Sequence, residues 1–238
     1  MNRSSILQAL EDVQRRIAKA AHAACRVPES ICLIAVSKHF SVNTIREAYA
    51  AGCQHFGENY AQEFKAKAMH LRDDDITWHF IGNLQSNKTR IVAEYAQWVH
   101  TIDRFSIAKR LSEQRADTLP HLNVCIQVNI SAEPQKQGCP IANLLPLAKQ
   151  ITTLPNIRLR GLMCVPNQHL SCKALSEQFA LLRHLHQQVS EAGIFVDVLS
   201  MGMSHDLEHA IAEGATHIRI GTAIFGQRPN QNKITITN

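Results

Sequence analysis

Residues 31–52, ICLIAVSKHFSVNTIREAYAAG, combine one strand with one helix. The apolar run 31–36 is typical of a buried strand, and the apolar residues of 42–50 recur at helical spacing. Gly52 then closes the helix, as a C-terminal glycine does. A doubly wound open sheet would usually show a glycine-rich phosphate turn after its first strand. Here the strand is followed by KHFS (38–41), which favours a different parallel architecture.

The same strand–helix unit recurs along the chain. Strands are expected over 31–38, 54–59, 77–82, 98–103, 122–130, 157–165, 196–202 and 217–226. Helices are expected over 41–52, 60–71, 85–96, 104–116, 141–154, 173–193 and 204–215, after an extra amphipathic helix at 1–24. Repeated units of this kind predict a parallel sheet. Their number predicts an α/β fold, a single (β/α)8 TIM barrel with an extra N-terminal helix, occupying residues 1–238 as one domain.

Composition and charge exclude several classes of protein. Of 238 residues, 45% are hydrophobic and 19% charged, which is typical of a globular protein with a core. The net charge of +5 is spread along the chain and aromatic residues make up 5%, so we expect no specific nucleic-acid binding. Residues 1–24 do not resemble a signal peptide, and no apolar stretch approaches the ~18 residues of a membrane span. Seven cysteines without a CxxC pair predict reduced thiols in a cytoplasmic protein.

A barrel of this class places its site at the carboxyl ends of the strands. The residues expected there are polar and convergent: Lys38, Glu58, Asn59, His79, Gly82, Asp103, Asn129, Met163, 200–204 and 219–222. Two stretches are distinctive, SMGMS (200–204) after strand seven and RIGT (219–222) on strand eight. Loops after these two strands often bind a phosphate.

The residue types in these two stretches suit an anion. Gly202 and Gly221 let backbone amides approach closely, and Ser204 and Thr222 add hydroxyl donors. Helix N-termini supply further N–H groups. A purely structural role is the alternative, with the glycines as turn formers and Ser204 as a helix N-cap.

Lys38 ends the first strand at the mouth of the predicted barrel, opposite the expected phosphate cup. A charged residue at the end of a strand often has no function beyond contact with water, because the chain reaches the surface there. A lysine in a partly desolvated pocket can also form a Schiff base with an aldehyde. An aldehyde together with a phosphate suggests pyridoxal phosphate, whose ring nitrogen needs an Asp or Arg partner, here Arg219. Class I aldolases also use barrel lysines and phosphates, so the pattern alone leaves both possibilities open.

The sequence resembles the pyridoxal phosphate homeostasis protein family nearly from end to end. The matching stretches, in order, are AVSK, FGENYAQE, WHFIGNLQSNK, HTID, VNIS with EPQKQG, LRGLM, LSMGMS followed by Asp206, and RIGTAIFG. The resemblance implies a barrel similar to the N-terminal domain of alanine racemase, with pyridoxal phosphate as cofactor. It implies these cofactor-binding residues: Lys38 as the imine lysine, Arg219 facing the pyridine nitrogen, Ser204, Gly221 and Thr222 at the phosphate, and Asn59, His79 and Met201 lining the cofactor.

Three residues depart from the family pattern. His39 follows Lys38 where the family commonly has SKT, Asn83 replaces the usual proline or histidine, and Cys164 replaces a common alanine. These departures are expected to change details of the site rather than cofactor binding itself.

One motif competes with this interpretation. HDLEH (205–209) fits the H-x-x-E-H pattern of inverted zincins. Such short patterns match often by chance, and no other histidine or cysteine shows ligand spacing, so no metal site is expected.

The function expected from the resemblance is binding of pyridoxal phosphate in intracellular vitamin B6 homeostasis, without catalytic turnover and hence without catalytic residues. A pyridoxal-phosphate-dependent racemase and a Schiff-base aldolase are the alternatives. Racemisation needs acid/base groups on both faces of the substrate. The chain ends soon after strand eight, without room for the second domain that gives alanine racemase its tyrosine. The expected partners are pyridoxal phosphate and apo forms of enzymes that use it, with no membrane, and we expect a monomer.

Overall fold

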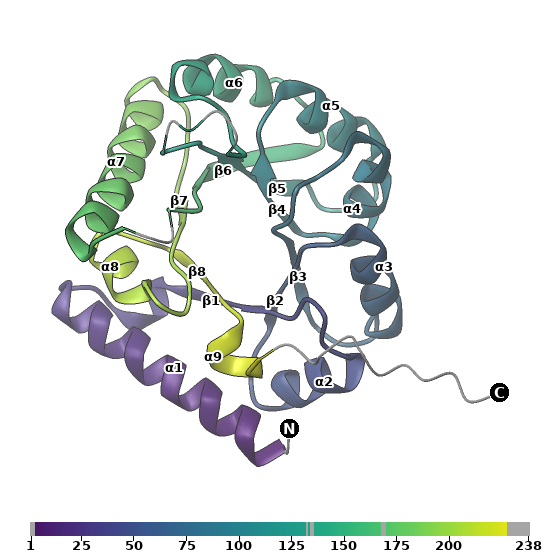
Figure 1. Ribbon diagram of the computed structural model, residues 1–238. Coiled ribbons are helices and arrows are strands. Elements are labelled where there is room, and N and C mark those ends of the chain that lie inside the picture. The colour runs from purple at the N-terminus through teal and green to yellow at the C-terminus, as the bar shows by residue number, and fades with distance from the viewer. Residues whose placement is uncertain (1–2, 132, 134–135, 168–169, 228–238) are drawn as a thin grey trace.

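Eight parallel strands, within the residues that the structure describes, close into a barrel in the order β1 to β8 (Figure 1). The structure is a computed structural model that describes residues 3–131, 133, 136–167 and 170–227. The strands are β1 (Cys32–Val36), β2 (His55–Glu58), β3 (Thr77–Phe80), β4 (Trp98–Ile102), β5 (Leu122–Gln127), β6 (Ile157–Met163), β7 (Val198–Ser200) and β8 (His217–Ile220). The predicted (β/α)8 barrel is confirmed.

The helices form the outer ring of the barrel (Figure 1). They are α1 (Arg3–Ala23), α2 (Val42–Ala50), α3 (Ala61–His70), α4 (Thr89–Tyr95), α5 (Phe105–Gln114), α6 (Leu144–Ile151), α7 (Cys172–Glu191), α8 (Leu207–Ala212) and α9 (Thr222–Phe225). Of the short 3-10 turns, η1 (Pro28–Ser30) lies between α1 and β1, η2 (Ser86–Lys88) between β3 and α4, and η3 (Ile141–Asn143) between β5 and α6. The predicted C-terminal glycines Gly52, Gly193 and Gly214 have φ of 95°, 80° and 95°, which suits a residue without a Cβ.

Strand register separates the outer core from the barrel interior. Cys32 pairs with His217 and Ile34 with Arg219 across β1 and β8, so these side chains point to one side, the interior. The intervening Ile218 points outward and is fully buried in the core between strands and helices. The outer layer is therefore apolar, while the interior of the barrel holds polar side chains.

The extra N-terminal helix α1 packs across α2, α8 and α9 on the outside of the barrel (Figure 1). Ile6, Leu10, Val13 and Ile17 are buried along one of its faces, at the spacing of an amphipathic helix. Arg16 of the same helix donates to the carboxylate of Glu208 in α8, at 2.7 and 2.9 Å. α1 therefore covers the elements that follow β7 and β8.

The eighth predicted strand, 217–226, is too long. β8 ends at Ile220, Gly221 leaves the extended conformation, and residues 222–225 form the helix α9. The amides of Ile224 and Phe225 both donate to the carbonyl of Gly221, which replaces strand pairing by a helical turn. Gly221 and Thr222 of RIGT therefore belong to a turn and a helix start.

Two further findings concern membrane-spanning helices and cysteines. None of the helices in the described part of the chain combines the length and the apolar composition that a membrane span needs. All seven cysteines are free.

Candidate functional site

Lys38 lies in a tight turn directly after β1. The amide of Ser37 donates to the carbonyl of Gly57 in β2 at 3.0 Å, and the amide of Phe40 donates to the carbonyl of Ser37 at 3.0 Å. His39 has φ of 68°, which is uncommon for a residue other than glycine, and its amide donates to Glu63 Oε1 at 2.6 Å. The backbone around Lys38 is thus held from both sides at the carboxyl end of β1.

A buried ion cluster supports this turn. Lys67 Nζ, from α3, lies 2.7 Å from Glu58 Oε1, Glu63 Oε1 and the carbonyl oxygen of Ser37. The hydroxyl of Ser37 donates to the same Glu58 oxygen at 2.6 Å. Burial raises the pKa of Glu58, and the charge and hydrogen bond of Lys67 oppose that rise. Glu58 was expected at the barrel mouth, but Lys67 was not; its i,i+4 spacing from Glu63 is the one sequence signal for it.

The loop after β7 has its conformation fixed by contacts within the fold. Met201 is fully buried, and Gly202 has φ of 97°. A Cβ on Gly202 would come within 2.6 Å of Ala210 Cβ, so the loop itself requires a glycine here. The carboxylate of Asp206 accepts from the amide of Met203, and Arg16 donates to the carbonyl of Ser204 at 3.0 Å. Gly202 therefore has the turn-forming role that the sequence left open as the alternative.

The end of β8 lies beside Lys38, not across the barrel from it. β1 and β8 are hydrogen-bonded neighbours, and a Cβ on Gly221 would meet Val36, two residues before Lys38, at 3.5 Å. The prediction that the phosphate cup faces Lys38 from the opposite wall is therefore wrong, because closure of the barrel joins the first strand to the last. Thr222 lies at the start of α9, next to the same junction.

Arg219 is buried in the wall of the barrel. Its guanidinium donates to Ser200 Oγ at 2.7 Å and to the carbonyl of Cys164 at 2.8 Å. Burial lowers the pKa of this guanidinium from its very high ordinary value. A fixed, desolvated cation of this kind is a strong hydrogen-bond donor to an aromatic nitrogen or an anion.

A column of three histidines, His55, His79 and His100, runs through the barrel interior to this arginine. His55 Nδ1 lies 3.0 Å from His79 Nε2, and His79 Nδ1 lies 2.9 Å from His100 Nε2. His100 Nδ1 lies 2.8 Å from Ser200 Oγ, the atom that also accepts from Arg219. Burial lowers the pKa of all three imidazoles, which keeps them neutral near neutral pH. Of the three, sequence analysis predicted only His79.

Two buried polar atoms at the end of β2 have no hydrogen-bond partner among the described residues. They are Glu58 Oε2 and Asn59 Oδ1. Unsatisfied buried polar atoms are costly and rare in native proteins, so they indicate a ligand or solvent that completes them. Asn59 follows β2, the strand that pairs with β1, and β1 is the strand that leads to Lys38. A ligand rich in polar groups fits this end of the barrel.

Two residues of the H-x-x-E-H pattern have other partners. Glu208 pairs with Arg16, and His209 Nδ1 lies 3.1 Å from Ser176 Oγ. Asp206 precedes the helix α8, as expected of a residue at a helix start.

The chain is similar to known proteins over most of its length. The family model described as alanine racemase, N-terminal domain, matches residues 9–229. A protein of Pseudomonas aeruginosa named pyridoxal phosphate homeostasis protein is 52% identical over 225 residues, which cover 94% of this chain and 96% of that protein. This chain belongs to the pyridoxal phosphate homeostasis protein family.

Solved structures agree with this family assignment. PipY of Synechococcus elongatus, solved with pyridoxal phosphate bound, is 39% identical with a TM-score of 0.79, over 88% of this chain and 100% of that one. Alanine racemase of Corynebacterium glutamicum is 19% identical with a TM-score of 0.66, over 94% of this chain and 61% of that one. The racemase therefore shares the fold alone with this member of the homeostasis protein family.

Proposed function

We propose that this protein binds pyridoxal phosphate through a covalent bond between Lys38 Nζ and the aldehyde carbon, and that it holds the cofactor for vitamin B6 homeostasis without turnover. The observation that supports this most is PipY, a homologous barrel of 39% identity that was solved with pyridoxal phosphate. The name of the Pseudomonas aeruginosa relative points to the same role. In this chain a lysine, a buried arginine and an unsatisfied amide oxygen gather at one end of the barrel.

The residues present fit such a cofactor. Lys38 would bind the aldehyde, and Arg219 would donate to the ring nitrogen. The amides and hydroxyls of Ser204, Gly221 and Thr222 would hold the phosphate beside β1. Asn59 Oδ1, which is unsatisfied, would gain a donor. His79 and Met201 stay predictions as lining residues; both nitrogens of His79 are already within 3.0 Å of other imidazoles, which leaves the face and edge of its ring for a contact.

The side chains around this site favour storage over catalysis. Bound pyridoxal phosphate supplies an electron sink that is strongest when its ring nitrogen is protonated. Arg219 stays charged and donates a hydrogen bond without giving up its proton, which weakens that sink. The one tyrosine near the barrel mouth is Tyr60, which is 52% exposed with its ring 5.1 Å from that of His39. Water-exposed Tyr60 is poorly suited to be the second acid/base group of a racemase.

The wider role follows from the same chemistry. A protein that holds a reactive aldehyde without consuming it can release it to apo forms of enzymes that need it, and we propose these as its partners. A cytoplasmic monomer is part of the proposal, and its seven free cysteines suit a reducing compartment.

The experiment that tests the proposal is the absorbance of the imine. Wild-type protein incubated with pyridoxal phosphate should show an imine band, and Lys38→Ala should abolish it although phosphate contacts keep some cofactor bound. Lys65→Ala, in the nearby helix α3, is the matched control and should keep the band. After borohydride reduction, mass spectrometry should map the adduct to the peptide with Lys38. An adduct on Lys65, Lys88 or Lys136 would overturn the assignment.

A further inference from the structure

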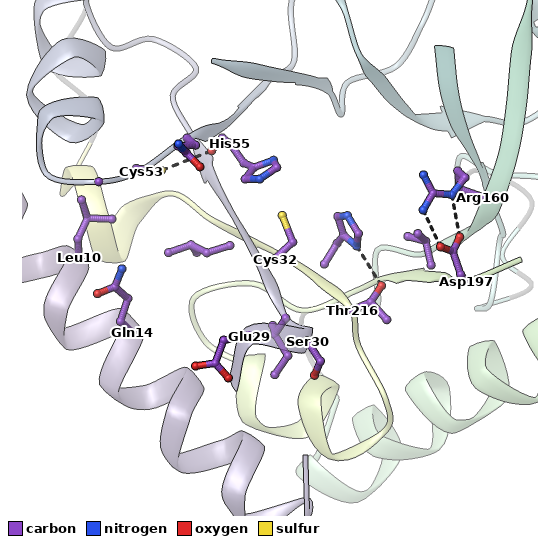
Figure 2. A pocket seen from close by; sticks show the side chains of 16 residues that line it. Leu10, Gln14, Glu29, Ser30, Cys32, Cys53, His55, Arg160, Asp197 and Thr216 are labelled. Atoms are coloured by element: carbon purple, nitrogen blue, oxygen red, sulfur yellow. Dashed lines mark hydrogen bonds and ion pairs between the residues drawn. The ribbon is translucent and has the colours of Figure 1, made fainter. Parts of the chain in front are cut away.

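The N-terminal end of the barrel, opposite the proposed cofactor site, contains a pocket of about 490 Å³ (Figure 2). Its walls include the first residues of three strands, Cys32 of β1, His55 of β2 and His217 of β8. Helix α1 contributes Leu10 and Gln14 to its rim. The pocket is thus separate from the proposed cofactor site, and neither the proposed cofactor function nor the family name accounts for it.

Three side chains at this pocket combine the ligand atoms of a soft metal site. The ligand atoms of Cys32, His55 and His79 all lie within 4.8 Å of one another. Cys32 and His55 line the pocket, and Figure 2 shows the two side chains on neighbouring parts of its wall. His79 lies behind His55, fully buried, and its Nε2 is 3.0 Å from His55 Nδ1. One thiol and two imidazoles in this spacing form the only such group of three among the described residues.

We infer that Cys32, His55 and His79 form a site for Zn²⁺, with a fourth position open to the pocket. Bond lengths of about 2.0–2.1 Å to nitrogen and about 2.3 Å to sulfur put the ligand atoms of a tetrahedral zinc site about 3.3–3.6 Å apart. The imidazole pair at 3.0 Å is therefore within a few tenths of an ångström of the required separation. The metal ion would replace the proton that these two nitrogens now share. Three protein ligands and one solvent position are the arrangement of an open zinc site.

The hydrogen bonds around these ligands suit the ion. The imidazoles bind a metal through a deprotonated ring nitrogen and Cys32 through its thiolate, so the protons that the ion displaces leave to solvent. His79 Nδ1 bonds to His100, which bonds to Ser200. This outer chain would orient His79 and leave its Nε2 free to bind metal, as outer hydrogen bonds do in zinc sites.

The test is metal titration of the full chain without an affinity tag. Reduced, chelator-treated protein is titrated with Co²⁺, which reports four-coordinate geometry by its visible ligand-field bands and a thiolate ligand by a near-ultraviolet charge-transfer band. Zn²⁺ affinity is then measured by competition with a chromophoric chelator. Wild type should bind one equivalent. Cys32→Ser should lose the charge-transfer band, and Cys32→Ser and His55→Gln should each weaken Zn²⁺ binding at least ~100-fold, since removing even outer-shell partners costs ~10–100-fold.

Matched controls use exposed residues of the same types, Cys172→Ser and His184→Ala in α7, and both should bind as the wild type does. Far-ultraviolet circular dichroism checks that each variant is folded. If either Cys32→Ser or His55→Gln does not fold, the remaining folded variant is enough to test the site. Binding of less than one equivalent, a charge-transfer band that survives Cys32→Ser, or equal losses in the α7 controls would overturn the assignment. Metal binding is measured independently of the imine spectrum, so failure of the zinc site can be distinguished from failure of the proposed cofactor function.

Discussion

Lys67 Nζ lies 2.7 Å from Glu58 Oε1, and both side chains are buried beneath the turn that contains Lys38. The same ammonium group bonds to the carbonyl of Ser37, which precedes Lys38. The pair therefore connects α3 and β2 to the end of β1. It explains why the strand ends in an ordered turn: the buried ammonium group of Lys67 holds the backbone next to Lys38, the lysine that we propose binds the cofactor.

Replacing Lys67 by methionine should destabilise the protein by about 3–5 kcal/mol, because it leaves the buried carboxylate of Glu58 without its counter-ion. The free energy of unfolding from urea titration measures this loss. The double variant Glu58→Gln with Lys67→Met should recover part of it, because no charge then stays buried and unpaired. Lys67→Met should also reduce the yield of the imine, because the turn before Lys38 loses its support.

The matched control is Lys109→Met, which removes an exposed lysine 3.8 Å from Glu113 in the i,i+4 relation. Exposed helical pairs contribute about 0.3–0.5 kcal/mol. A loss for Lys67→Met as small as that of Lys109→Met would show that the cluster does not support the turn.

The fold could be predicted because each strand–helix unit has a local signature. Apolar runs, helical spacing and C-terminal glycines such as Gly52 are read within a few residues of sequence. The end of β8 could not be predicted, because IRIGTAIFG (218–226) is mostly apolar and both a strand and a short helix bury such residues. Only the barrel closure, which places Gly221 against Val36, decides where the strand stops.

The sequence could predict which residues of the candidate site lie at strand ends, but it could not predict the contacts between residues of different strands. Cys32, His55 and His79 belong to three successive strands, so no short spacing pattern connects them. Parallel register and inward side-chain direction bring them together. A systematic search for inward-facing histidines on adjacent predicted strands would have found the column of His55, His79 and His100.

The phosphate contacts can be tested with Ser204→Ala combined with Thr222→Ala. Each hydrogen bond to a charged group contributes about 1.5–3 kcal/mol, so affinity for pyridoxal phosphate should fall at least ~10–100-fold. Binding of unphosphorylated pyridoxal should hardly change. Because α8 and α9 have only six and four residues, hydroxyls and loop amides should dominate over helix dipoles. Equilibrium dialysis with both ligands measures the ratio.

The control for this pair is Thr152→Ala with Thr153→Ala, whose hydroxyls bond to carbonyls at the end of α6. It should leave both affinities unchanged. Equal losses for pyridoxal phosphate and pyridoxal in the Ser204 and Thr222 variant would place the phosphate elsewhere.

The ion pair between α1 and α8 predicts a pH dependence of stability. The hydrogen bond from Arg16 holds the pKa of the Glu208 carboxyl below its ordinary value of 4.5. A carboxyl with a lower pKa in the folded state stabilises it above the unfolded pKa and loses this effect as the pH falls through the folded pKa. Both side chains are partly exposed, so the contribution should be about 0.3–1 kcal/mol.

Comparison of wild type with Glu208→Gln measures this contribution. Wild type should be more stable by about that amount at ~pH 7, and the difference should vanish by ~pH 2–3, where the carboxylate is protonated. Glu113→Gln, in an exposed helical pair, is the control and should change stability less. A difference between wild type and Glu208→Gln that grows on acidification would contradict the assignment.

The last prediction is that the protein does not racemise amino acids. Lys38 could act as a base on one face of a bound amino acid once substrate has displaced it, but the second face needs another positioned group. The hydroxyl of Tyr49 accepts from the amide of Asp75 at 3.2 Å, and the ring of Tyr95 packs edge-on against Phe64, so neither is available to the barrel mouth. Tyr60 is exposed at the start of α3.

Cofactor-loaded protein is therefore expected to cause no optical inversion of L-alanine and L-serine, and to exchange the Cα hydrogen for solvent deuterium far more slowly than enzymes turn over. Tyr60→Phe serves as the internal check, because any slow exchange that depends on Tyr60 would reveal it as a hidden acid/base group. Turnover in the range of ~1–10³ s⁻¹, typical of enzymes, would refute the storage function and establish a racemase in its place. Exchange far below that range and unchanged in Tyr60→Phe is what a lysine acting on one face alone would give, because a proton removed and returned by the same group leaves the configuration as it was.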